Sequence, residues 1–246
     1  MRFAAIADVH GNVAALEAVL ADIAALGISD VVNLGDHFSG PLAAGRTGDL
    51  LLKRDFPSIR GNHDRWLLEQ SRDEMGPSDA AADADLRPEH KTWLAGLPVT
   101  LVYRDEVFLC HGTPTSDTTY WLETVSPDAI VHQAPIEQVE REAKGVDFPL
   151  ILCGHTHIPR GVRLRDGRYI VNPGSVGAPG YDDDAPVYHV VQTGNPDACY
   201  AVLEKVQDQW QVMFRYVPYD TAPMVARARS RNRPEWARAL ESGWVR

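Results

Sequence analysis

Apolar runs alternate with amphipathic stretches along the first third of the chain, a pattern typical of strands that alternate with helices. Residues 3–7 and 30–34 predict two buried strands. Between them, residues 13–26 carry apolar side chains at helical spacing, and Gly27 supplies a stop signal. A further strand is expected at residues 57–60, and further helices are expected at residues 47–52, 65–75 and 88–97. This part of the chain predicts a β-α-β arrangement.

The second half of the chain is richer in strands than in helices. Apolar runs at residues 101–103 and 107–110 flank Arg104-Asp105-Glu106, a spacing that predicts a hairpin. Later apolar runs predict strands at residues 150–153, 162–164, 169–171, 187–191, 200–204 and 211–216. We therefore expect an α/β fold in which two mixed β-sheets pack face to face with helices on the outside, a four-layer α/β/β/α sandwich.

The length of 246 residues suits one large domain. We expect a single domain over residues 1–246, with an insertion at residues 113–148 and a C-terminal extension at residues 219–246. Residues 76–85 are rich in Ala and Asp, with Gly and Pro at their start, and predict an exposed loop.

The sequence also contains an aromatic segment and a basic segment that match none of the motifs. The aromatic residues Tyr120 and Trp121, next to Leu122, could line a cleft or pack in the core. A basic cluster near the C-terminus is interpreted as a solvated helix or tail, and it comprises Arg227, Arg229, Arg231 and Arg233.

Composition excludes several classes of function. The net charge of −10 opposes tight association with nucleic acid, which normally requires clustered Lys and Arg. No apolar run approaches the roughly 20 residues that cross a bilayer, and no secretory signal opens the chain, so we expect a cytoplasmic protein. Cys110, Cys153 and Cys199 are interpreted as buried thiols rather than disulfide partners. Composition does not indicate an oligomeric state.

Polar clusters follow five of the predicted strands. They are Asp8-Val9-His10, Gly35-Asp36, Gly61-Asn62-His63-Asp64, His111-Gly112 and Gly154-His155-Thr156-His157. The carboxyl ends of strands form the crevice where α/β proteins bind ligands, so we expect these side chains to converge. Residues two apart in an extended segment, such as Asp8 and His10, can point the same way. Imidazoles, carboxylates and an amide oxygen suit Mn, Fe, Zn, Ni or Co better than Ca.

In this order the clusters resemble the signature of the calcineurin-like metallophosphoesterase family, which reads DxH, GD, GNHD or GNHE, a later His, and GHxH. The resemblance extends over about residues 1–175. It includes Asn172-Pro173-Gly174-Ser175, which resembles the segment that closes the sheet in the small bacterial phosphodiesterase-like branch.

The resemblance implies two divalent metal ions bridged by Asp36. The ligands it assigns are Asp8, His10, Asp36 and His157 for one ion, and Asp36, Asn62, His111 and His155 for the other. A hydroxide held by both ions would attack the phosphorus of a phosphodiester or phosphomonoester. His63 would act as general acid on the leaving group, and Asp64 would orient the His63 ring. The expected partner is a small phosphorylated substrate.

Alternatives remain for three features. Asp64 could instead cap the helix that follows it. His37, where family members more often carry an apolar residue, could contact substrate phosphate or Asp36, or could be a loop histidine facing solvent. The whole chain could be a catalytically weak metal-binding scaffold for protein–protein interaction, although the complete ligand set argues against this. We assign no role to His90, His132 or His189.

Overall fold

Strand β1 (Arg2–Ile6) lies inside the first sheet, and four of its five residues are apolar and buried. In the computed structural model, which describes residues 1–246, β1 pairs in parallel with β2 (Val31–Asn33) and antiparallel with β12 (Ala198–Val206). Strand β13 (Gln209–Val217) pairs antiparallel with β12 and completes the order β13-β12-β1-β2. The first sheet is therefore mixed.

The second sheet has the strand order β3-β4-β7-β9-β8. Its strands are β3 (Leu101–Tyr103), β4 (Val107–Leu109), β7 (Leu150–Leu152), β8 (Arg160–Arg163) and β9 (Tyr169–Asn172). Strands β4, β7 and β9 are parallel, whereas the edge strands β3 and β8 pair antiparallel with their neighbours. Every residue of β7 is buried because both faces of this central strand are covered.

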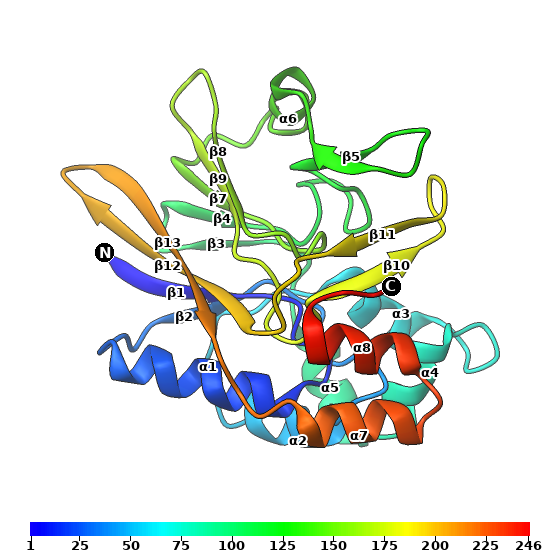
Figure 1. Ribbon diagram of the computed structural model, residues 1–246. Coiled ribbons are helices and arrows are strands. Elements are labelled where there is room, and N and C mark those ends of the chain that lie inside the picture. Colours follow the sequence, from blue (N-terminus) through cyan, green and yellow to red (C-terminus); the bar gives the residue numbers. More distant parts are fainter.

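The two sheets pack face to face through apolar side chains such as Phe3 and Leu152. Helices cover the outer faces, as Figure 1 shows. Those over the first sheet include α1 (Val13–Ala25), α2 (Ala44–Leu51) and α5 (Pro88–Gly96), and the one over the second sheet is α6 (Ile136–Glu142). The structure therefore confirms the predicted four-layer α/β/β/α sandwich.

Helix α3 (Asn62–Glu69) begins and ends earlier than the predicted range of residues 65–75. Gly61 precedes it in an extended conformation, and its amide donates a hydrogen bond of 2.9 Å to the carboxylate of Asp64. This contact satisfies a backbone donor at the helix start and fixes the boundary. The polar cluster after Gly61 consequently lies in the first helical turn.

The strand predicted at residues 57–60 is reduced to one parallel bridge between Asn33 and Ser58. Pro57 has no N–H to donate to a neighbouring strand. The pairing is limited to two backbone hydrogen bonds, from the Asn33 amide to the Pro57 carbonyl at 2.9 Å and from the Ile59 amide to the Asn33 carbonyl at 3.0 Å.

The prediction of an exposed loop at residues 76–85 is wrong. Residues Pro77–Asp83 form helix α4, with Gly76 extended before it and Asp79 in its first turn. Proline fits the first helical position because its missing N–H would have no partner there. Ala82 anchors the helix in the core beneath the first sheet.

The segment at residues 113–148 contains elements that its weak periodicity does not predict. Strands β5 (Glu123–Val125) and β6 (Val131–Gln133) form a hairpin, and α6 follows. The Trp121 indole is buried and donates to the Val139 carbonyl at 3.0 Å, so this ring belongs to the core. Strand β10 (Gly180–Asp183), paired with β11 (His189–Gln192), is also unexpected because its acidic residues favour turns.

Two helices end the chain, α7 (Ala222–Ser230) and α8 (Pro234–Ser242). Their apolar faces, including Met224 and Leu240, form a buried cluster with Leu42. Figure 1 shows α8 between α7 and β10, with the C-terminus near β10. None of the helices combines the length and apolar character needed to cross a bilayer.

The arginines of this region do not form a solvated tail. Nη2 of Arg227 donates to both carboxylate oxygens of Asp85, at 3.0 and 3.1 Å, and Arg231 donates to the carbonyl of Ala81 at 3.1 Å. Arg229 alone among these three is largely exposed. The interpretation is right about a helix, because Arg227 and Arg229 lie on α7, and wrong about solvation, because a cluster of positive charge in the sequence does not reveal which carboxylates the fold brings to it.

Candidate metal centre and active-site cleft

Backbone hydrogen bonds connect the loops that carry the predicted ligands. The Asp8 amide donates to the Gly35 carbonyl and the His10 amide to the Asp36 carbonyl, each at 3.0 Å. The Gly177 amide donates in turn to the Asp8 carbonyl at 3.0 Å. The loops that follow β1, β2 and β9 are therefore fixed against one another.

The segment after β9 also holds the loop that contains the last two histidines. The Asn172 side-chain amide donates to the carbonyl of Gly154 at 2.7 Å, directly before His155. The Ser175 hydroxyl donates to the Asp8 carbonyl at 2.8 Å. Asn172 and Ser175 are both buried, so these contacts are shielded from water.

Several predicted ligands have left-handed backbone conformations, which side chains other than glycine rarely adopt. Their φ angles are 54° for Asp8, 49° for His10, 55° for Asp36, 70° for His155 and 59° for His157. Such a conformation costs about 1 kcal/mol or more per residue, and such outliers cluster at functional sites. The prediction that alternation along an extended segment aligns Asp8 with His10 is therefore wrong, because β1 ends at Ile6 and both residues lie in a tight loop.

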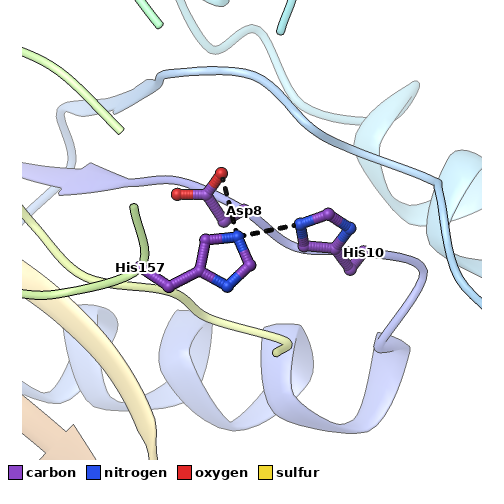
Figure 2. A group of neighbouring side chains, drawn as sticks. All are labelled: Asp8, His10 and His157. Atoms are coloured by element: carbon purple, nitrogen blue, oxygen red, sulfur yellow. Dashed lines mark hydrogen bonds and ion pairs between the residues drawn. The ribbon is translucent and has the colours of Figure 1, made fainter. Parts of the chain in front are cut away.

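One group of potential metal ligands comprises Asp8, His10 and His157, which Figure 2 shows converging. The Nε2 atoms of His10 and His157 are 3.1 Å apart. Oδ1 of Asp8 lies 3.6 Å from Nε2 of His157. All three residues are buried.

A second group comprises Asp36, His111 and His155. Oδ2 of Asp36 lies 3.3 Å from Nε2 of His111 and 3.9 Å from Nε2 of His10, so this oxygen lies between the two groups. Oδ1 of Asn62 lies 3.1 Å from Nε2 of His111. The structure therefore brings together all seven predicted ligands, with His155 and His157 in different groups.

Hydrogen bonds to backbone carbonyls fix which ring nitrogen faces the centre. Nδ1 of His10, His111 and His157 each lies 2.7 Å from a carbonyl oxygen and donates to it. In His10 and His157, whose pKa values burial lowers, Nε2 is thereby left with a lone pair directed inward, and Nε2 of His111 faces the oxygens of Asp36 and Asn62. In His155 the roles are reversed, because Nε2 lies 3.0 Å from the Thr118 carbonyl and Nδ1 is free. Rings oriented in this way are typical of metal-binding histidines.

The buried carboxylate of Asp8 provides the clearest test of whether a cation fits. Both of its oxygens are buried and neither has a hydrogen-bond partner. An unpaired buried carboxylate is strongly unfavourable, and inward lone pairs on His10 and His157 only 3.1 Å apart repel each other. A divalent cation would satisfy all three groups, so the residues present fit a metal ion.

The charges of the centre reinforce this interpretation. Burial raises the pKa of Asp8 to about 8, and the charge of Asp36 adds to the rise. Burial lowers the pKa of His10 to about 4 and that of His155 to about 3, so both rings are neutral near pH 7. Burial also acts to lower the pKa of His111, but Asp36 outweighs it and raises that pKa to about 10. The centre thus favours positive charge beside Asp36.

His63 lies at the edge of this centre, with its ring centroid 5.6 Å from that of His10. Its Nδ1 is 2.9 Å from Oδ1 of Asp79 on α4. Burial acts to lower the pKa of His63, but Asp36 and Asp79 raise it to about 9, which favours an imidazolium. The sequence signal for Asp79 is the helix start formed by Pro77 and a following acidic residue, which the expected loop at residues 76–85 does not include.

Asp64 does not contact the His63 ring as expected. Its carboxylate accepts hydrogen bonds from the amides of Asp36, His37 and Gly61, at 2.8, 3.0 and 2.9 Å. Asp64 therefore stabilises the start of α3, as in the capping alternative, and also holds the loop that carries Asp36. The residue that contacts the His63 ring is Asp79.

His37 neither lines the cleft nor faces solvent, and its ring nitrogens contact Asn33 and Ile59 rather than Asp36, so all of its proposed roles are wrong. The residue is fully buried, and its Nε2 donates to the Ile59 carbonyl at 3.0 Å. Nδ1 accepts from the side-chain amide of Asn33 at 3.1 Å. The ring also packs edge-on against Trp93, with centroids 5.0 Å apart. His37 is a fully hydrogen-bonded core residue.

A cleft of about 710 Å³ opens above the candidate metal centre. It is bounded by α3 and α4 on the side of His63, by residues from the 113–148 segment, by β10 and by α8. Its aromatic lining residues are Trp66, Tyr120, Tyr181 and Trp236. A cleft of this size accommodates a small organic ligand.

Comparison with known proteins shows which family this chain resembles in sequence and in structure. The model of the calcineurin-like phosphoesterase superfamily domain matches residues 1–208. An uncharacterised protein of Methanocaldococcus jannaschii is 26% identical over 255 residues, covering 95% of this chain and 94% of its own length. A metallophosphoesterase from Sphaerobacter thermophilus has a similar structure, with 28% identity, a TM-score of 0.76 and 99% of both chains covered.

A hypothetical protein from Pyrococcus horikoshii shares the fold, with a TM-score of 0.75, 20% identity, and 99% of this chain and 98% of its own covered. The chain belongs to the calcineurin-like phosphoesterase superfamily. Membership implies metal-dependent hydrolysis of phosphate esters, and the grouped aspartates and histidines supply candidate ligands for that metal.

Proposed function

We propose that the protein hydrolyses a small phosphate ester at two divalent cations bridged by Asp36. One cation would be bound by Asp8, His10, Asp36 and His157, and the other by Asp36, Asn62, His111 and His155. The observation that carries the proposal is the buried Asp8 carboxylate, which has no hydrogen-bond partner and lies beside inward lone pairs. The position of Asp36 Oδ2 between the two groups supports the bridging role.

When bound, two such ions activate water as a nucleophile and polarise the phosphoryl oxygens. The protein's own contribution is to hold the ligand rings in one orientation through carbonyl contacts to Ser39, Leu34 and Ala178. The donor set of imidazole, carboxylate and amide suits Mn, Fe, Zn, Ni or Co. The loops carrying these donors are already hydrogen-bonded to one another, so the site is preorganised.

His63 is the general acid in this proposal. Its ring lines the cleft, and Asp79 accepts a hydrogen bond from Nδ1, which leaves Nε2–H of the imidazolium free to protonate the departing alkoxide. Asp79 acts as a positioning residue because it holds the ring and favours its charged form. No observation favours the alternative of a metal-binding scaffold.

Hydrolysis of chromogenic phosphomonoesters and phosphodiesters tests the proposal directly. Chelator-treated protein should be inactive, and addition of Mn, Ni, Zn or Co should restore turnover with two ions bound per chain. His63→Ala should retain both ions and lose turnover mainly on esters with poor leaving groups. Metal binding without turnover on any ester would exclude the hydrolase, and failure to bind metal would exclude the centre itself.

A further inference from the structure

The C-terminal arm, residues 219–246, brings an aromatic ring to the candidate metal centre. The ring centroid of Trp236 on α8 lies 6.0 Å from that of His10. A Cβ atom added at Gly40 would lie only 3.0 Å from the Trp236 ring, so the indole packs closely against the backbone at Gly40. Trp236 is therefore in contact with the loop that orients His10.

The arm is held firmly enough for Trp236 to have a fixed position. Arg233, just before α8, donates to the Ser78 hydroxyl at 3.1 Å. Arg227 contacts Asp85 through two hydrogen bonds. Apolar side chains of α7 and α8 also pack with Leu42 in a buried cluster, which holds both helices against the rest of the domain. A ring fixed in this way can present a binding surface with little loss of conformational entropy.

Other aromatic rings surround the same centre. The Tyr181 ring of β10 lies 4.7 Å from the His157 ring, and the Tyr120 ring lies 5.2 Å from the His155 ring, both measured between centroids. The two tyrosine hydroxyls are 2.7 Å apart and hydrogen-bonded. Three aromatic rings, from Trp236, Tyr181 and Tyr120, therefore lie beside the candidate metal centre.

The charge of the cleft limits what else a substrate can carry. Apart from histidines, Arg233 is the only basic residue of its lining, and this guanidinium already pairs with Glu235. Among the acidic lining residues, Glu235 pairs with Arg233 and Glu123 pairs with Arg160, whereas Asp182 and Asp183 have no basic partner. A second phosphate group placed away from the candidate ions would meet carboxylates rather than cations.

We propose that the substrate carries a single phosphate group esterified to a planar aromatic moiety, which binds against Trp236. This inference rests on the proposed phosphoesterase function and adds the substrate class. Residue 236 lies beyond residues 1–208, which the family model matches. Stacking on an aromatic side chain strengthens binding by about tenfold or more for each ring.

The matched probes phenylphosphonate and methylphosphonate test the inference by calorimetric binding to the Mn-loaded protein, without turnover. The wild-type protein should bind phenylphosphonate about tenfold more tightly than methylphosphonate. Trp236→Ala should reduce this preference to less than about twofold, because only the ring contact is lost. Trp244→Ala is the control, since Trp244 belongs to the same arm, is 50% exposed and lies outside the cleft.

Benzene-1,4-diphosphonate tests the charge argument on the wild-type protein and should bind more weakly than phenylphosphonate. An unchanged phenyl preference in Trp236→Ala, or tighter binding of the diphosphonate, would overturn the inference. If neither phenylphosphonate nor methylphosphonate binds, the proposed metal centre is contradicted. If both bind equally well, only the proposed aromatic substrate class is contradicted. Should Trp236→Ala not fold, as judged by its thermal transition, Trp236→Leu preserves apolar volume and carries the same test.

Discussion

Nδ1 of His63 lies 2.9 Å from Oδ1 of Asp79, which joins the first turn of α3 to the first turn of α4 at the edge of the cleft. The pair places an imidazole beside the candidate ions while keeping its second nitrogen available. It also makes the chemistry of the site depend on a short helix that provides none of the predicted metal ligands.

Removing the Asp79 carboxylate should impair the acid without emptying the metal centre. In Asp79→Asn, turnover of esters with poor leaving groups should fall by about tenfold or more, while activated aryl esters change little. Asp79 raises the pKa of His63, so its loss should move the decline of activity at alkaline pH to lower pH. The pH profile of kcat/KM measures this shift. Asp83→Asn on the same helix removes a pair with Lys91 and should leave the profile in place.

Asp8→Asn should have opposite effects on metal binding and on the stability of the metal-free protein. Bound metal should fall from two ions toward one, as measured by elemental analysis. The chelated variant should nevertheless be more stable than chelated wild type by about 1 kcal/mol or more, because an unpaired buried carboxylate is removed. Asp105→Asn is the control, since Asp105 is exposed and has a similar φ of 59°. Unchanged metal content in Asp8→Asn would contradict its role as a ligand.

His37→Ala should lower stability rather than substrate affinity. The substitution removes a buried ring with two hydrogen bonds and leaves a cavity beside Trp93, which should cost about 2–4 kcal/mol in the free energy of unfolding. Chemical denaturation measures that loss, and KM should stay close to the wild-type value. His132→Ala, at an exposed position, should change neither quantity. A selective rise in KM at normal stability would restore the substrate role.

Asp22 should contribute stability that disappears in acid. Hydrogen bonds from Arg215 lower its pKa, and one from Tyr200 adds to this effect. Because the folded-state pKa is below the ordinary 3.8, the contribution is complete above pH 3.8 and declines as pH falls through the lower value. Asp22→Asn should therefore cost about 1 kcal/mol at pH 6 and less near pH 3. Denaturation of the metal-free protein at both pH values, with exposed Asp55→Asn as control, checks this difference.

The sequence predicts the convergence of the motif side chains because each motif follows an apolar run, and the carboxyl ends of neighbouring strands meet at one edge of a sheet. It does not predict the partner of His63. Asp64 is adjacent in sequence, but the first turn of α3 directs its carboxylate toward backbone amides. Asp79 reaches the ring only because α4 docks beside α3, a tertiary arrangement without a periodic signature. The same limit applies to Trp236, whose position depends on packing far along the chain.

The order in which the parts of the cleft occur along the chain has a consequence for biosynthesis. During translation, both sheets and every predicted metal ligand emerge from the ribosome before α8, which contributes Trp236. Arg233, which precedes α8 and contacts Ser78 beside Asp79, also emerges after them. A nascent polypeptide can assemble its sandwich core while Trp236 is still missing from the cleft. Synthesis of α8 thus becomes the step that brings the Trp236 ring into the cleft.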